Sequence, residues 1–224
     1  MESNAQERLK EGQEVQVQIG PVAHGGHFVA RYNGQVIFVR HGITNEIAKV
    51  KITSVNSKIA HADVIEVIEP ATSRVAAPCK FAGNCGGCDF QHIDIQTQRI
   101  FKSEIVKEQF LRIGKIDLAE RGFDLVTKAV EPVDGLHWRT RMDFAVSQNG
   151  KIGFYGARSN EVVEIDDCLI ADSRMNVGEL SGRSWKSDAR VEVAVSSTDE
   201  VSIMRSGRSI SGPTQIVEQV GGSS

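Results

Sequence analysis

Three observations predict that this chain of 224 residues has an α+β fold that is mainly β. Short stretches of alternating apolar and polar residues fill positions 12–70 and return after position 140. One longer stretch, residues 92–113, contains no glycine or proline and has helical periodicity. We therefore expect a flexible N-terminus at 1–11, an OB-like β-barrel at 12–70 and a second, mostly antiparallel α+β domain at 71–224.

The first domain is expected to contain five strands. Residues 14–19 alternate between polar and apolar side chains, which is the period of a half-buried strand. Two apolar runs follow, separated by Asn33-Gly34, which is a strong signal for a tight hairpin turn. Residues 47–53 and 62–68 alternate in the same way. Five short strands with tight turns favour a small closed or nearly closed barrel of the OB type.

The second domain is expected to begin with a loop, followed by a helix and several strands. Apolar side chains fall on two sides of the expected helix, with Ile100 and Leu111 opposite the broader apolar face. We therefore expect this helix to pack between two other elements. Strand signals return at 142–146, 152–155, 161–165 and 190–195.

Composition and charge exclude several classes of protein. The net charge is −3, which argues against a strongly basic nucleic-acid binder, and 6% aromatic residues make a large base-stacking surface improbable. The charge is unevenly distributed: residues 71–158 carry +3 and residues 159–224 carry −5. No apolar run approaches the roughly 18 residues of a membrane helix, and the N-terminus lacks the features of a signal peptide. We expect a cytoplasmic protein that makes no membrane contact.

Four cysteines form the most specific pattern in the sequence. Cys79, Cys85 and Cys88 lie within ten residues with C-x5-C-x2-C spacing, and Cys168 is distant. Glycines between them would allow positive φ angles and bring backbone N–H groups close to sulfur. A cubane iron–sulfur cluster needs four thiolates and accepts one from a distant strand. The spacing favours a [4Fe-4S] cluster with all four cysteines as ligands.

Three other interpretations of the cysteines stay open at this point. Disulfides would require export, for which there is no signal. Buried thiols without a ligand are common singly but not in a Cys-Gly-Gly-Cys loop. Structural zinc is usually held by two C-x2-C pairs, whereas this chain has one such pair.

The cysteine loop resembles the iron–sulfur signature of the RNA uracil-5-methyltransferases, which include enzymes acting on 23S ribosomal RNA and transfer RNA. The similarity continues at Gln98 and Lys102, although Ile95 stands where the family usually has tyrosine. Residues 138–142 resemble the family's Tyr-Arg-Asn-Arg segment, and residues 153–168 resemble the segment with the fourth cluster ligand. Residues 12–70 resemble the TRAM domain, an OB-like RNA-binding module.

The resemblance implies S-adenosylmethionine-dependent methylation of uridine C5 in structured ribosomal or transfer RNA. In the family a thiolate adds to C6, the activated C5 takes the methyl group, and a base then removes the C5 proton. The methyl donor, the nucleophilic cysteine and the base belong to a Rossmann-like domain that we do not find in this sequence. We therefore expect no methyl-donor site and no catalytic residue in this chain, and no methylation by the chain alone.

Four arginines are the candidates for RNA contacts. Arg31 follows an expected strand of the barrel, and Arg139 and Arg141 alternate, so that both could project from one strand face. Arg158 lies in the second domain. Guanidinium groups suit phosphates and unstacked bases, although surface arginines more often pair with carboxylates.

Two functions of different class are consistent with the sequence. The chain is either the RNA-recognition and iron–sulfur part of an RNA uracil-5-methyltransferase or a free-standing, non-catalytic RNA-binding iron–sulfur protein. Under both hypotheses we expect a monomer that binds structured RNA.

Overall fold

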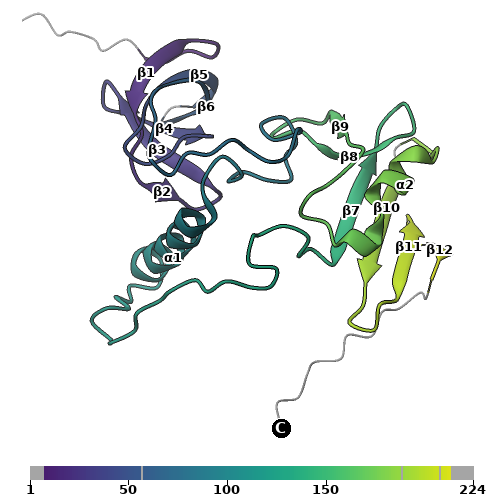
Figure 1. Cartoon of the computed structure of the whole chain (residues 1–224). Helices are drawn as coiled ribbons and strands as arrows, with labels where there is room; N and C mark the ends of the chain where they lie inside the picture. The colour runs from purple at the N-terminus through teal and green to yellow at the C-terminus, as the bar shows by residue number, and fades with distance from the viewer. Residues whose placement is uncertain (1–7, 57, 188, 207, 213–224) are drawn as a thin grey trace, which may run out of the picture. The chain divides into compact units, whose positions relative to one another are not determined.

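The computed structural model describes residues 8–212 except 57, 188 and 207, and within them the protein is mostly β with some helix (Figure 1). Contacts between residues divide the chain into two compact units. Unit 1 contains residues 1–77 and 89–128, and unit 2 contains residues 78–88 and 129–224. The two units are therefore interleaved along the sequence, whereas the expected division at residue 70 is linear.

A curled six-stranded sheet, which we call the half-barrel, forms most of unit 1. Its strand order is β1-β5-β6-β4-β3-β2. All neighbours are antiparallel except β4 and β6, which pair in parallel. The strands are β1 (Glu14–Gln18), β2 (Val22–Ala23), β3 (His27–Tyr32), β4 (Gln35–Arg40), β5 (Ile47–Val55) and β6 (Ile59–Glu69).

The period-2 pattern of these strands explains the core of the half-barrel. Alternate side chains of β1 are buried, as predicted, and Phe28 and Ile37 on β3 and β4 are completely buried. Leu9 joins the same core, while residues 1–7 of the expected flexible N-terminus lie outside the described residues. Gly20 allows the sheet to curl, because its N–H donates to the Val29 carbonyl at 2.7 Å and a Cβ there would lie 2.6 Å from that oxygen.

The turn and helix signals of unit 1 are confirmed. Asn33 and Gly34 both have positive φ and form the two-residue turn between β3 and β4. Helix α1 (Ile95–Arg112) begins after Asp94, whose carboxylate accepts the N–H groups of Gln96 and Thr97 at 3.0 Å. Phe101 anchors the helix on the half-barrel through an edge-to-face contact with Phe28, with ring centroids 5.4 Å apart.

Unit 2 contains a six-stranded antiparallel sheet of order β12-β11-β10-β7-β8-β9. Its strands are β7 (Arg141–Val146), β8 (Ile152–Tyr155), β9 (Val162–Glu164), β10 (Arg190–Val195), β11 (Val201–Arg205) and β12 (Arg208–Ser211). A short 3-10 helix, η1 (Ser173–Met175), and helix α2 (Val177–Gly182) contribute Met175 and Leu180 to the core of the sheet.

The structure confirms the α+β class and the antiparallel second sheet but differs from the sequence expectation in three details. The N-terminal sheet has six strands rather than five, because the two-residue strand β2 was not anticipated. The long helix belongs to unit 1 and not to the second sheet. Strands β11 and β12 and helix α2 were not predicted.

Within the described residues, no helix combines the length and the apolar character needed to cross a bilayer.

Candidate metal centre and nucleic-acid contacts

The cysteine loop, residues 78–88, is held by backbone hydrogen bonds rather than by a strand. A turn closes when the Ala82 N–H donates to the Cys79 carbonyl at 3.0 Å, and the Cys85 N–H donates to the Phe81 carbonyl at 2.9 Å. Cys85 also forms an isolated antiparallel bridge with Gly156, which follows β8. The loop therefore attaches to the sheet of unit 2 by its middle, at Cys85.

The glycines of this loop act differently from the expectation that all would take positive φ. Only Gly83 does so, at φ 91°. Gly86 instead permits a close approach to β8: its N–H donates to the Tyr155 carbonyl at 3.0 Å, and a Cβ would lie 2.6 Å from that oxygen. Gly87 fulfils the other expectation, because its N–H donates to Cys85 Sγ at 3.4 Å.

Cys168 belongs to the same unit as the other three cysteines. It lies after β9 and packs against the apolar core of the sheet. Its own N–H donates to the Asp167 carboxylate at 2.7 Å, and its carbonyl accepts the Ala171 N–H at 2.9 Å. The Lys80–Asp166 ion pair, with 2.7 Å between Nζ and Oδ2, joins the cysteine loop to this segment. All four cysteines are half-buried thiols rather than halves of disulfides.

The thiols of Cys85 and Cys168 share one electrostatic environment. Burial raises the pKa of Cys85, the Gly87 N–H opposes that shift, and Cys79 raises the pKa further. Burial also raises the pKa of Cys168, backbone N–H groups that follow it oppose that shift, and the charges of Cys85 and Cys79 raise it. Three of the four sulfurs are thus close enough to repel one another when ionised, and N–H groups point at two of them.

The surroundings of the sulfurs fit ligation of a cluster by thiolates. N–H donors directed at sulfur are what ligated thiolates require, since each ligated thiolate keeps a negative charge. Each thiolate of a four-iron cluster binds a different iron, so the four sulfurs need not converge on one point. Within the part of the chain that the structure describes, no group of three or more histidine, cysteine or acidic side chains is arranged to hold a metal ion.

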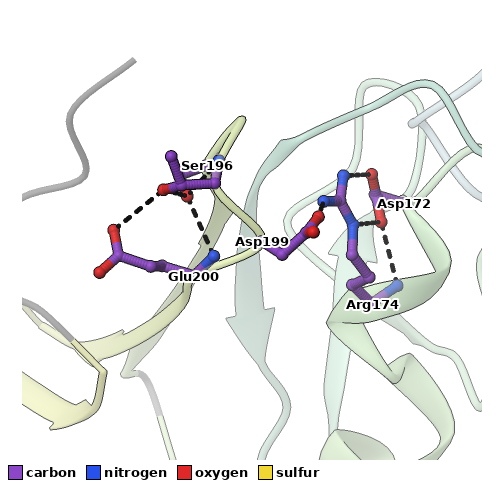
Figure 2. Close-up of polar contacts among 6 residues, drawn as sticks. Asp172, Arg174, Ser196, Asp199 and Glu200 are labelled. Carbon is purple, nitrogen blue, oxygen red and sulfur yellow. Dashed lines mark hydrogen bonds and ion pairs between the residues drawn. The ribbon is translucent and has the colours of Figure 1, made fainter. Parts of the chain in front are cut away.

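A polar network supports the segment that follows Cys168 (Figure 2). The Arg174 guanidinium binds both oxygens of Asp172, at 2.8 and 2.6 Å, and also pairs with Asp199. The Asp172 N–H in turn donates to the Arg139 carbonyl at 3.0 Å. In the same figure the hydroxyl of Ser196 accepts the Glu200 N–H at 3.0 Å and closes the β10–β11 turn. We interpret this network as structural, because each polar group has a partner within it.

The four candidate RNA-contact arginines are placed differently. Arg31 is exposed near the end of β3 in unit 1, whereas the other three belong to unit 2. Arg141 is exposed at the start of β7, and Arg139 is half-buried in an isolated parallel bridge with Ala171. Arg158 is exposed in a turn after β8, with φ 53°.

Two exposed aromatic residues of unit 2 were missed by sequence reasoning. Trp138 is 49% exposed and precedes Arg139, while Tyr155 is 46% exposed and has the Arg190 guanidinium 6.0 Å from its ring centroid. The position of Trp138 in sequence, next to Arg139 and close to Arg141, is the signal that could have identified it. Exposed aromatic rings next to guanidinium groups offer stacking surfaces for unpaired bases.

His92 follows the cysteine loop closely in sequence, but its side chain binds the half-barrel. Its Nε2 lies 3.1 Å from the Gly42 carbonyl, so the side chain binds the β4–β5 connection of the half-barrel. Burial lowers the pKa of His92 to about 4, although the hydrogen bond with Gly42 acts in the opposite direction.

A buried ion pair fixes the exit of the half-barrel. Glu46 is completely buried and pairs with Arg74 at 2.6 and 2.7 Å. The remaining oxygen capacity of Glu46 is used by the N–H groups of Ile43 and Ala71, at 2.9 and 3.1 Å. Arg74 also donates to the His41 carbonyl at 2.8 Å. The residues after β6 are therefore tied back to the sheet.

Comparison with known proteins finds a matching domain model and similar proteins. Residues 8–65, which form most of the half-barrel, match the model of the TRAM domain. The chain is 40% identical over 194 residues to an uncharacterized RNA methyltransferase of Streptomyces coelicolor, covering 81% of this chain and 42% of the relative. It is 36% identical over 152 residues to the 23S rRNA (uracil(1939)-C(5))-methyltransferase of Halomonas elongata, covering 66% of this chain and 30% of that one.

Among solved structures, the tRNA (uracil-54, C5)-methyltransferase of Pyrococcus abyssi in complex with S-adenosyl-L-homocysteine covers 82% of this chain and 44% of that chain. The identity is 19% and the TM-score is 0.47.

The half-barrel therefore defines a TRAM-domain protein. Its relatives are RNA methyltransferases, one of them a 23S rRNA uracil-C5-methyltransferase, in agreement with the resemblance found in the sequence. The chain spans less than half the length of the Streptomyces relatives that it matches, 42% in Streptomyces coelicolor and 47% in Streptomyces avermitilis.

Proposed function

We propose that this chain recognises structured ribosomal or transfer RNA and holds a [4Fe-4S] cluster, as part of a cytoplasmic machinery for S-adenosylmethionine-dependent methylation of uridine C5. The observation that carries the proposal is the arrangement of the cysteines in unit 2. Chain segments 80 residues apart in sequence meet there, with backbone N–H groups directed at the sulfurs of Cys85 and Cys168.

Cys79, Cys85, Cys88 and Cys168 would hold the cluster. When bound, the cluster supplies a cross-link between the cysteine loop and the Cys168 segment rather than electrons, because methyl transfer is redox-neutral. The residues of the chain itself hold the loop against β8 through Gly86 and the segment after Cys168 through Arg174. Both devices reduce the conformational freedom of the ligands before any cluster binds.

RNA recognition would use both units. The TRAM domain presents the exposed Arg31. Unit 2 presents the exposed Arg141 and Arg158 and the half-buried Arg139, together with the exposed Trp138. Guanidinium groups bind phosphates, and an exposed indole ring can stack on an unpaired base. Because the net charge of residues 71–158 is only +3 and that of residues 159–224 is −5, we expect weak binding.

The cluster is tested by purifying the chain without oxygen. We expect a brown protein with about four irons per chain. Stoichiometric zinc, with no charge-transfer absorption from thiolate to iron, would contradict the assignment.

RNA binding is tested by measuring affinity for a structured RNA as a function of salt. Each neutralised phosphate contributes slightly less than one unit to the slope, so we expect a shallow slope of roughly two to four. The double variant Arg139→Gln/Arg141→Gln should lower both affinity and slope. The matched control Arg112→Gln/Arg121→Gln removes the same charge from α1 and the loop after it. It should lower affinity and slope only by the amount expected from the change in net charge. Equal effects of the two double variants would contradict a specific role for Arg139 and Arg141.

Methylation is tested with labelled S-adenosylmethionine. We expect no transfer of methyl groups to RNA by this chain alone, and transfer once a methyltransferase domain is supplied. If the supplied domain is active but gains nothing from this chain, the chain is instead a free-standing RNA-binding protein.

A further inference from the structure

We propose that the outward face of α1 and the groove beside it form the docking surface for a methyltransferase domain. The proposal rests on the function proposed above and names the partner surface that this function requires. Helix α1 is apolar on more than one side. Phe101 and Ile105 pack against the half-barrel core, so these two side chains account for one side of the helix.

The other apolar side chains of α1 have no such cover. Val106, Phe110 and Ile113 follow the i, i+4, i+7 spacing of one helix face, and Phe110 and Ile113 are 42% and 75% exposed. Leu111 is 53% exposed on a neighbouring face. Figure 1 shows α1 extending away from the half-barrel and followed by a long loop. Contiguous exposed apolar surface of this kind marks an interaction site.

The loop after α1 enlarges this surface into a groove of about 450 Å³. Leu111, Leu118 and Phe123 supply its apolar lining, and Phe123 is 65% exposed. The Lys107–Asp124 ion pair, with 3.3 Å between Nζ and Oδ1, lies at the groove and joins the helix to the loop. Two hydrogen bonds fix the far end of the loop on α1. The Thr127 N–H donates to the buried Ser103 hydroxyl oxygen at 2.8 Å, and that hydroxyl donates to the Thr127 hydroxyl oxygen at 2.9 Å. The groove is thus a built part of unit 1.

The chemistry of this surface selects a protein domain over RNA. The charged residues that line the groove are one basic residue, Lys107, and three acidic ones, Glu108, Asp117 and Asp124, so the groove offers phosphates no net attraction. An apolar centre with charges of both signs around it is the composition of a protein interface. More than half of each Streptomyces relative lies outside the part that matches this chain. The unmatched part is long enough to form a domain that could cover the apolar surface.

The experiment compares this chain with a chimera that extends it by the part of the Streptomyces coelicolor relative outside the matched residues. Hydroxyl-radical footprinting measures how fast Phe110 and Leu111 are modified. We expect their rates in the chimera to fall by about tenfold, as for side chains at the centre of an interface. Ile68 on β6, which is 44% exposed, is the matched control and should keep its rate.

Two further measurements use this chain alone. Phe110 and Leu111 should be modified rapidly at every protein concentration, and Leu111→Glu should leave the unfolding midpoint unchanged. Protection that grows with concentration would show that a second copy is the occupant, and protection at all concentrations or strong destabilisation would show that the chain covers the face itself. Each of these results would overturn the proposal, as would rapid modification in a chimera whose circular dichroism shows that it is folded.

The RNA affinity of Leu111→Glu separates this proposal from the function on which it rests. We expect that affinity to equal the wild-type value. If neither the wild-type chain nor Leu111→Glu binds RNA, but Phe110 and Leu111 are protected in the chimera, the proposed RNA function is wrong and the docking proposal is still supported.

Discussion

The half-barrel unit and the cysteine-loop unit hold their non-regular segments by different means. In unit 1 the segment after β6 is fixed by a completely buried carboxylate, Glu46, that binds Arg74 and two backbone N–H groups. In unit 2 the cysteine loop is fixed by one isolated bridge, in which the Gly86 N–H donates to the Tyr155 carbonyl, and by an ion pair whose side chains are more than 60% exposed. Groups of the protein itself therefore hold the segment of unit 1 through buried polar contacts, whereas the contacts of the cysteine loop are weaker, and the proposed cluster would add a further constraint there.

The largest expected effect is that of Cys85→Ser. The proposed cluster would close the long chain segment between the 79–88 region and Cys168, so its loss would remove a long-range constraint from unit 2 alone. We expect low iron content and rapid proteolysis within residues 78–88 and 129–212, while fragments of 8–77 and 89–128 resist. Equal loss of both sets of fragments in limited proteolysis would contradict the difference between the units.

Arg74→Met tests unit 1 in the same way. The substitution leaves Glu46 buried without its charge partner, which costs about 3–5 kcal/mol of unfolding free energy in comparable cases. Denaturant unfolding monitored within unit 1 measures this loss. Arg112→Met is the matched control, because Arg112 is 75% exposed and its pair with Glu108 contributes at most about 0.5 kcal/mol.

The pH dependence of unit 1 is expected to be intermediate in size. The folded pKa of His92, about 4, lies below its ordinary value of 6.5, so the unfolded state binds the proton more readily. The stability that neutral His92 provides is complete above pH 6.5, is lost as the pH falls from 6.5 to 4, and amounts to at most about 3 kcal/mol. His41 shifts in the same direction, because of burial.

Unfolding of His92→Asn across that pH range provides the measurement. The slope of stability against pH should decrease in this variant and stay unchanged in His24→Asn, which alters an exposed histidine. An unchanged slope in His92→Asn would show that the buried ring does not govern the acid response of unit 1.

The smallest expected effect is that of Lys80→Gln. The Lys80–Asp166 pair is exposed and screened by solvent, so its loss should hardly change the stability of unit 2 and should leave the iron content unchanged. Since Lys80 lies in the cysteine loop without being a ligand, the variant is also the control for Cys85→Ser. Loss of iron in Lys80→Gln would mean that the surface pair, rather than the thiolates, holds the loop.

Local features of the fold were predictable from the sequence, because they depend on neighbouring residues. Asn33-Gly34 indicated its turn, and the uninterrupted stretch after Asp94 indicated α1. The cysteine spacing indicated a shared site, and Cys168 does lie in the same unit as the cysteine loop. Short elements such as β2 and α2 are too brief to show a period, and they were missed.

Long-range partners could not be predicted, because several residues were equally suitable in sequence. The contact of Phe101 with Phe28 assigns α1 to unit 1, yet the apolar pattern of the helix fits a sheet in either unit. The pairing of Arg74 with Glu46 depends on a separation of 28 residues and on a buried position that the charge pattern does not reveal. The same holds for His92, which lies close to the cysteine loop in sequence but has the Gly42 carbonyl, 50 residues away, as its partner.

The cysteine loop enters and leaves unit 2 from the same neighbour, since residue 77 before it and residue 89 after it both belong to unit 1. When unit 2 alone unfolds, a folded unit 1 still holds both ends of the 78–88 segment. The segment then behaves as a loop whose two ends are held, which has fewer conformations than a free chain. A disulfide that closes a loop has the same effect. Three of the four thiols consequently stay concentrated in a small volume, so the proposed cluster, once lost, could be rebuilt on them before Cys168 returns.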